Sequence, residues 1–102
     1  MQAEYNGIKY QWDDKKNEIN IKKHGSDFET AVRVFADPNS VDLYDSKHSD
    51  DEERYTIIGM IDTKTVLLSV VYTPRGDVYR IISAREANKE ERRIYNAYNQ
   101  NT

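Results

Sequence analysis

The sequence predicts one α+β domain over residues 1–102, with an antiparallel sheet, two N-terminal helices and a C-terminal helix. Residues 54–61, 65–73 and 78–84 are rich in apolar and β-branched residues, and the links between them are short enough for hairpins. These segments predict an antiparallel meander of three strands. Helical patterns lie before and after the meander, so we expect the helices to pack on one face of the sheet. A chain of 102 residues is long enough for one hydrophobic core but not for two.

The first 25 residues predict a strand followed by a surface helix. In residues 5–12, large apolar side chains recur at every second position: Ile8, Tyr10 and Trp12. Asp13 or Asp14 can cap the following helix, and Gly25 is well placed to end it. Few apolar residues lie between these caps, so we expect this helix on the surface.

The second predicted helix begins with a capping-box pattern, in which Ser26 is the N-cap and Glu29 reaches back to it. An amphipathic stripe follows from four apolar residues at helical spacing: Phe28, Ala31, Val32 and Phe35. The sequence Asp37-Pro38-Asn39 ends this helix.

The remaining segments complete the sheet and add the last helix. Residues 41–44 predict a short strand, and residues 45–52 a polar loop. Gly59 marks a candidate β-bulge in the strand 54–61. Residues 86–98 predict a helix in which four side chains share one stripe, with Tyr95 beside it: Ala87, Glu91, Ile94 and Tyr98.

Composition excludes several classes of function. The chain has no cysteine, which excludes disulfides, thiolate metal sites and cysteine nucleophiles. It has neither an apolar run long enough to span a bilayer nor the pattern of a signal peptide, so we expect a cytoplasmic protein. The net charge of -3 counts against a general nucleic-acid binder. However, the acidic residues concentrate in residues 42–53, which leaves room for a local basic pocket.

The segment Arg80–Arg85 is the strongest indication of a functional site. It predicts a buried strand with Arg80 inside it and Arg85 just past its end. A guanidinium in a strand interior must be stabilised by a partner or by an anionic ligand. Because arginine presents a planar fork of donors that fits phosphate oxygens, the segment indicates phosphate binding.

Short motifs in one order carry a family resemblance: Trp12-Asp13, Lys23-His24-Gly25, Phe28-Glu29, Val34-Phe35, His48-Ser49, Glu53-Arg54-Tyr55, Ile58-Gly59, Arg80–Arg85, Glu91-Arg92 and Tyr95. Over residues 8–98 this set resembles the BrnT family of toxins from type II toxin–antitoxin pairs. The resemblance implies a RelE-like fold and a metal-independent ribonuclease that inhibits translation. It also implies neutralisation by a BrnA antitoxin, whose ribbon-helix-helix domain binds the operator DNA, and it leaves open a homodimer within that complex.

Metal-free RNA cleavage needs a base for the 2′-hydroxyl, cations for the pentacoordinate phosphate and an acid for the 5′-oxygen. The resemblance places suitable side chains at six candidate catalytic positions: Arg80, Arg54, Glu53, His24, Lys23 and Arg85. Arg80 is the first candidate for stabilising the phosphate, and Arg54 is the second. Which of Glu53 and His24 acts as base or acid stays open. No cofactor and no metal are expected.

Several candidates have a purely structural alternative. Arg80 can pair with a carboxylate at the sheet surface. Arg85 can form a salt bridge with Glu86 or Glu90. His24 lies at the end of a helix, where its side chain can cap the last backbone carbonyls. Each of these contacts would occupy the side chain without any role in catalysis.

The segment around Glu53 adds two further alternatives. Glu53 and Arg54 are neighbours, so a regular strand points them to opposite faces. Only Arg54 then faces Arg80, and Glu53 joins it only if a bulge turns its side chain inward. His48 lies in the acidic loop, where it is either solvated or part of a metal site with Asp45, Asp50 and Asp51, although their spacing matches no known ligand pattern.

The acidic balance keeps a second class of function open. In that alternative the chain is an inactive interaction module that holds its antitoxin and helps to regulate the operon. Both hypotheses require a protein partner, and only catalysis separates them.

Overall fold

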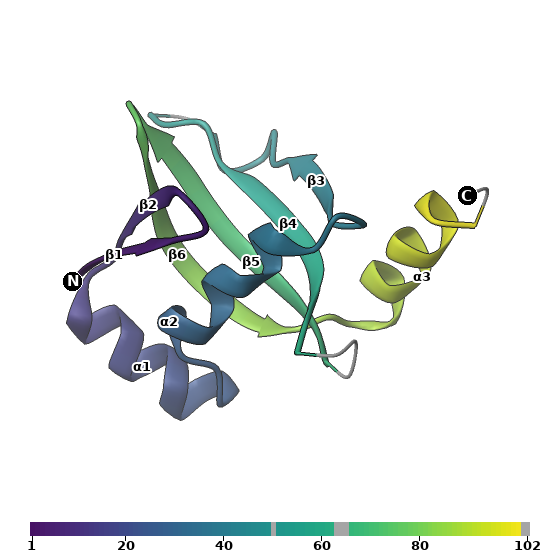
Figure 1. Cartoon of the computed structure of the whole chain (residues 1–102), viewed down its shortest axis with the longest axis horizontal. Coiled ribbons are helices and arrows are strands. Elements are labelled where there is room, and N and C mark those ends of the chain that lie inside the picture. Colours follow the sequence, from purple (N-terminus) through teal and green to yellow (C-terminus); the bar gives the residue numbers. More distant parts are fainter. Residues whose placement is uncertain (50, 63–65, 101–102) are drawn as a thin grey trace.

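The computed structural model describes residues 1–49, 51–62 and 66–100. It is a six-stranded sheet with helices on both faces (Figure 1). The elements follow in this order: β1 Gln2–Tyr5, β2 Ile8–Gln11, α1 Asp14–His24, α2 Phe28–Ala31, the 3-10 helix η1 Val32–Ala36, β3 Val41–Tyr44, β4 Tyr55–Ile61, β5 Val66–Arg75, β6 Val78–Glu86 and α3 Lys89–Tyr98. None of the described helices is long and apolar enough to cross a membrane.

The predicted meander is confirmed. Strands β4, β5 and β6 are consecutive and antiparallel, and the short strand β3 pairs with β4 at the edge. Strands β5 and β6 each extend two residues beyond the predicted ends, to Arg75 and Glu86. Predicted strand residue 65 lies outside the described residues.

The sheet is mixed, so the predicted purely antiparallel sheet is wrong. Its strand order is β1-β2-β6-β5-β4-β3, and β2 runs parallel to β6 with Tyr10 opposite Tyr79. Strand β1, which was not predicted, pairs with β2 through a turn at Asn6 and Gly7, both at positive φ. An Asn-Gly pair is a strong sequence signal for such a hairpin.

The helices lie on opposite faces of the sheet, which corrects the predicted arrangement on one face. On the first face, α1, α2 and η1 cover a core whose most deeply buried residues include Tyr10, Phe28 and Val70. On the other face, α3 buries Tyr95 against Ile58 and Leu67. Figure 1 shows α1 and α2 at one side of the sheet and α3 at the other. Helix α3 thereby leaves much of its own face of the sheet uncovered.

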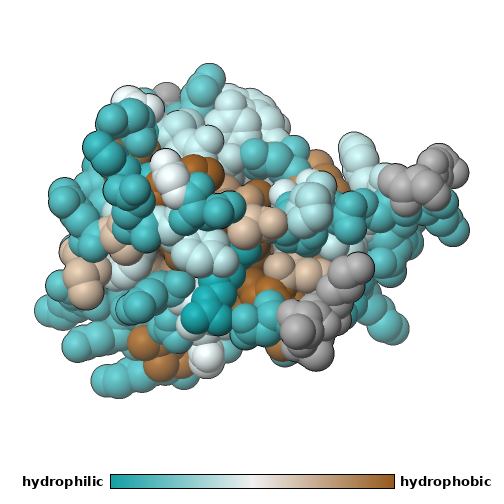
Figure 2. Space-filling model, in the orientation of Figure 1, coloured by the Kyte–Doolittle hydropathy of each residue, from teal (hydrophilic) through white to brown (hydrophobic). Residues whose placement is uncertain are grey.

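Helix α1 begins and ends as predicted and lies on the surface. The side chain of Asp13 caps it, and Gly25 ends it at a φ of 74°. Its exposed apolar residues are Ile19 and Ile21. Figure 2 shows hydrophobic side chains in small groups among hydrophilic ones, including over α1.

A buried side chain ties α1 to the sheet. Asn20 donates a hydrogen bond of 2.7 Å to the carbonyl of Ala84 on β6, and its own carbonyl accepts one of 3.1 Å from the Ala84 N–H. The side-chain amide also donates to the carbonyl of Ser26 at 2.7 Å. One polar side chain therefore positions α1 on both β6 and the turn that follows the helix.

The second helix starts one residue later than predicted. Asp27, not Ser26, caps α2, because its carboxylate accepts a hydrogen bond of 2.7 Å from the Thr30 N–H. After a single α-helical turn the segment continues as the 3-10 helix η1, which buries Val34 completely. The predicted stop before Pro38 is confirmed by the end of η1.

The predicted bulge at Gly59 is wrong, because Gly59 pairs regularly with Leu68. A Cβ at residue 59 would lie 3.0 Å from both the Cβ and the carbonyl oxygen of Val34. Gly59 therefore allows η1 to approach the sheet closely. The register shift lies instead between β5 and β6, where Ile82 is the additional residue.

Helix α3 begins at a capping box formed by Asn88 and Glu91. Tyr95 and Ile94 pack against the sheet. Tyr98 is 67% exposed, whereas Tyr95, which was placed beside the predicted stripe, is buried. Asp37 completes the packing of this helix, since its carboxylate accepts a hydrogen bond of 2.7 Å from the Tyr95 hydroxyl.

Candidate functional site: an arginine cluster

Arg80 lies on the face of the sheet opposite to α1, α2 and η1. Its strand neighbours Tyr79 and Ile81 contribute to the core beneath those helices, and side chains alternate between faces along a strand. The register places Arg80 opposite Thr73 on β5 and Gln11 on β2. Arg80 therefore occupies the side of the sheet that α3 covers only in part.

Two further arginines lie at the same end of this face. Tyr55 pairs with Tyr72, so the preceding residue, Arg54, lies beside Thr73. Arg75, the last residue of β5, lies two positions after Thr73 and therefore on the same face of the sheet. Together they form the arginine cluster: Arg54, Arg75 and Arg80.

Two members of the arginine cluster have no partner among the described residues. Neither Arg80 nor Arg54 forms a side-chain hydrogen bond or ion pair within the described part of the chain. Both side chains are only partly buried. The Thr73 hydroxyl, which lies between them, is buried and also has no hydrogen-bond partner among the described residues. These unpaired donors are available for a ligand that accepts hydrogen bonds.

Glu52 brings a carboxylate to the arginine cluster. It accepts hydrogen bonds from Arg75 at 2.7 and 2.8 Å. These hydrogen bonds are the largest cause of the lowered pKa of Glu52; burial opposes them, and the charges of all three arginines add to them. Arg80 also contributes to the lowered pKa of Asp13, which results mainly from the backbone N–H groups of α1. The positive potential of the cluster thus reaches both carboxylates.

The loop between β3 and β4 borders the arginine cluster. A cavity of about 230 Å³ is lined by residues of this loop and by Arg54: His48, Asp51, Glu52 and Arg54. The loop is closed by a hydrogen bond of 2.9 Å from the Asp45 N–H to the Arg54 carbonyl. A second bond of 2.9 Å joins the Arg54 N–H to the hydroxyl of Ser49. The cavity is polar and open to solvent.

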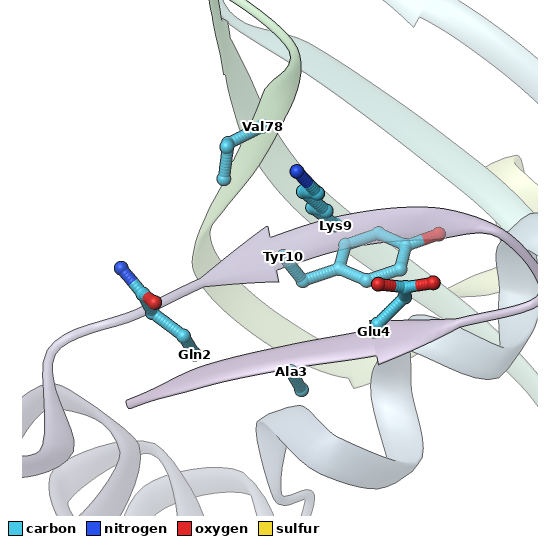
Figure 3. A pocket seen from close by; sticks show the side chains of 6 residues that line it. All are labelled: Gln2, Ala3, Glu4, Lys9, Tyr10 and Val78. Carbon is cyan, nitrogen blue, oxygen red and sulfur yellow. The ribbon is translucent and has the colours of Figure 1, made fainter.

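The β1–β2 hairpin forms a larger hollow of about 500 Å³, shown in Figure 3. Its lining comes from β1, β2 and β6: Gln2, Ala3, Glu4, Lys9, Tyr10 and Val78. Gln2 pairs with Gln11, and Gln11 pairs with Arg80. The hollow and the arginine cluster are therefore connected through neighbouring strands of the sheet.

The family of the chain follows from a match over most of its length. The model of the BrnT family, the ribonuclease toxin of type II toxin–antitoxin systems, matches residues 12–91. The chain belongs to the BrnT family. No curated protein matches the sequence. A type II system pairs its toxin with a protein antitoxin, so membership implies such a partner.

The BrnT match includes the whole arginine cluster but not β1. The sequence expectation that Arg80 and Arg54 lie on one face agrees with the strand register. The alternative in which Arg80 pairs with a surface carboxylate does not occur among the described residues. The register therefore puts both arginines on the same face of the sheet.

Lys23 and His24 do not lie beside the arginine cluster. Both are exposed at the end of α1, a helix of 11 residues that is therefore about 16 Å long. The start of α1 is near Arg80, whereas His24 lines a cavity with Glu86 at the other end of β6.

Glu53 and Arg85 are engaged elsewhere. The Tyr55 hydroxyl contacts the Glu53 carboxylate at 3.5 Å, which places Glu53 on the opposite side from Arg80. Arg85 forms hydrogen bonds of 2.7 and 3.0 Å with Glu91. The structural alternative, a salt bridge of Arg85 to Glu86 or Glu90, is therefore wrong in its partner, which is Glu91 in the first turn of α3.

Some site residues were not predicted. Arg75 and Glu52 were missed because the ion pair joins residues 23 positions apart. The contact between His48 and Asp45, at 2.9 Å, was missed because the loop conformation creates it. Among the described residues, no group of three histidines or carboxylates is arranged to hold a metal ion. Asp50, considered as a ligand with His48, lies outside the described residues.

Proposed function

We propose that this BrnT-family protein is a metal-independent endoribonuclease that inhibits translation, with Arg80 and Arg54 binding the scissile phosphate. The observation that supports the proposal is the pair of unpartnered guanidinium groups on one open face of the sheet. A guanidinium fits phosphate oxygens with paired hydrogen bonds, and it keeps its charge at every physiological pH.

The chemistry requires stabilisation of charge that develops on the phosphate oxygens. When the 2′-oxygen attacks, the pentacoordinate phosphate gains negative charge that fixed donors at its side can stabilise. Arg80 extends from the rigid interior of β6, and Arg54 is held by its backbone bond to Ser49. Preorganised donors of this kind act most strongly on the transition state.

We further propose that the partner is a BrnA-like ribbon-helix-helix antitoxin. Operator DNA is bound only through that antitoxin, because the toxin itself has a net charge of -3. The antitoxin covers the arginine cluster or the neighbouring sheet edge at β3. Binding of RNA and of antitoxin then exclude each other.

Substitution of the two free arginines tests this function. We expect Arg80→Ala and Arg54→Ala each to lower RNA cleavage by ~100-fold or more, the usual effect of removing one transition-state donor. Arg93→Ala is the matched control, because Arg93 is 74% exposed on α3 and pairs with Glu90 alone among the described residues. Cleavage by the purified wild-type protein should continue in EDTA, and growth arrest on expression should follow the same order. Folded Arg80→Ala protein that cleaves at the wild-type rate would contradict the assignment.

A second function, an interaction module without catalysis, is favoured by one observation. Glu52 places a carboxylate among the arginines and weakens their attraction for a polyanion. In that case the wild-type protein forms a complex with its antitoxin but neither cleaves RNA nor arrests growth. The cleavage assay with wild-type protein therefore separates the two functions.

A further inference from the structure

We propose that His48, held by Asp45, is the general base of the cleavage reaction. This inference rests on the proposed ribonuclease function and identifies the proton acceptor that the arginine cluster lacks. Nδ1 of His48 lies 2.9 Å from Oδ2 of Asp45. His48 is also exposed and lines the same cavity as Arg54.

The contact with Asp45 determines which nitrogen is free to accept a proton. An ionised carboxylate only accepts hydrogen bonds, so Nδ1 of neutral His48 carries the hydrogen and Nε2 keeps its lone pair. Burial acts to raise the pKa of Asp45, but His48 and the backbone N–H groups of Lys47 and His48 together lower it. Asp45 is therefore ionised at neutral pH and acts as a positioning residue.

The turn that carries His48 is rigidly connected to the arginine cluster. Oδ1 of Asp45 accepts hydrogen bonds from the backbone N–H groups of Lys47 at 3.1 Å and His48 at 3.3 Å. Ser49 donates its hydroxyl to the carbonyl of Asp45 and accepts from the Arg54 N–H. The base and one phosphate-binding residue are thus joined through a few hydrogen bonds.

The proposed step balances without a further reactant. Nε2 of His48 takes the proton of the 2′-hydroxyl, and the 2′-oxygen forms a bond to phosphorus. The bond from phosphorus to the 5′-oxygen breaks, and that oxygen takes a proton from water. The products are a 2′,3′-cyclic phosphate and a 5′-hydroxyl, and His48 returns its proton to solvent.

The charged surroundings of His48 suit this role. The groups that line its cavity are Asp51, Glu52 and Arg54, and Asp45 contacts its ring. The carboxylates stabilise the imidazolium that forms after proton transfer, as a buried aspartate does for a catalytic histidine in other enzymes. His24, the second histidine of the chain, lines a different cavity with Asp27 and Glu86 at the far end of β6, away from the arginine cluster.

The test compares substitutions at His48 and Asp45 in the full-length protein. We expect His48→Ala and His48→Gln to lower RNA cleavage by ~100-fold or more, within the range for loss of a general base. Imidazole added to His48→Ala should restore part of the activity, whereas it should not restore activity to Arg80→Ala. Asp45→Asn should lower kcat more than it raises KM.

Ser46→Ala, an exposed substitution in the same loop, controls for disturbance of the turn. Circular dichroism should show every variant folded. If wild type cleaves, Arg80→Ala does not, and His48→Ala retains the wild-type rate, then the assignment of His48 is overturned while the ribonuclease function stands. If wild type does not cleave RNA at all, both proposals are overturned.

Discussion

Glu52 binds Arg75 through two hydrogen bonds, although 23 residues separate them in the sequence. This ion pair lies beside Arg54 and Arg80, whose charges also lower the pKa of Glu52. The site that we propose for a polyanion therefore contains its own anion. In the proposed function, Glu52 competes with the phosphates of RNA for the arginine cluster.

Removal of the charge on Glu52 should strengthen RNA binding. We expect Glu52→Gln to bind RNA several-fold more tightly at low salt, because the three arginines no longer share a carboxylate. The difference should shrink as salt is added, since ions screen exposed charges. Titration of labelled RNA at two salt concentrations measures both effects. Glu90→Gln on α3 changes the net charge equally but lies away from the cluster, so equal gains in the two variants would refute a local effect.

The ion pair between Arg85 and Glu91 should make stability depend on pH. Burial acts to raise the pKa of Glu91, but hydrogen bonds from Arg85, the Asn88 N–H and Ser69 outweigh it and lower the pKa below its ordinary value of 4.5. Because the pKa of Glu91 is lower in the folded state, its ionised carboxylate stabilises the fold at pH values above the unfolded-state pKa. This stabilisation is lost as the pH falls through the folded-state pKa.

Urea unfolding of Glu91→Gln at several pH values measures this effect. The variant should be less stable than wild type at pH 7, and the difference should narrow as the pH falls below about 4.5. Glu90→Gln, on the same helix but in an exposed pair, should change stability little at any pH. A difference for Glu91→Gln that stays constant from pH 7 to pH 3 would show that the carboxylate does not contribute through its charge.

The close approach of η1 to β4 should make Gly59 intolerant of any side chain. We expect Gly59→Ala to lower the free energy of unfolding by about 1–3 kcal/mol, because the new methyl group would lie 3.0 Å from Val34 and its carbonyl. Gly59→Ser should be at least as destabilising. An unchanged midpoint of urea unfolding in both variants would mean that η1 moves away from the sheet at little cost.

The buried amide of Asn20 should be essential for docking α1. Asn20→Ala leaves the N–H and carbonyl of Ala84 without their hydrogen bonds, and each buried group left unpaired costs about 1–3 kcal/mol. We therefore expect a large loss of stability and faster hydrogen exchange in α1. Asn96→Ala, an exposed asparagine on α3, is the matched control. Similar unfolding midpoints for the two variants would contradict this role of Asn20.

Local interactions explain why part of this protein could be predicted from its sequence. The cap at Asp13, the end of α1 at Gly25 and the alternation within the meander depend on residues that are close in the chain. The same reasoning placed Arg54 and Arg80 on one face, because side chains alternate along paired strands. The hairpin at Asn6 and Gly7 is local as well, because an Asn-Gly pair favours a tight turn with positive φ at both residues.

Only the tertiary structure decided how these elements combine. The parallel pairing of β2 with β6, the opposite face chosen by α3 and the pairing of Arg85 with Glu91 depend on which surfaces meet after folding. The positions of Glu52 among the arginines and of His48 beside Arg54 also depend on the tertiary structure, because the loop between β3 and β4 brings both residues to the arginine cluster. Sequence periodicity determines which side of a strand or helix is apolar. It does not determine which distant element covers that side. Competing arrangements differ only slightly in free energy, and the burial and hydrogen bonding of the complete fold decide between them.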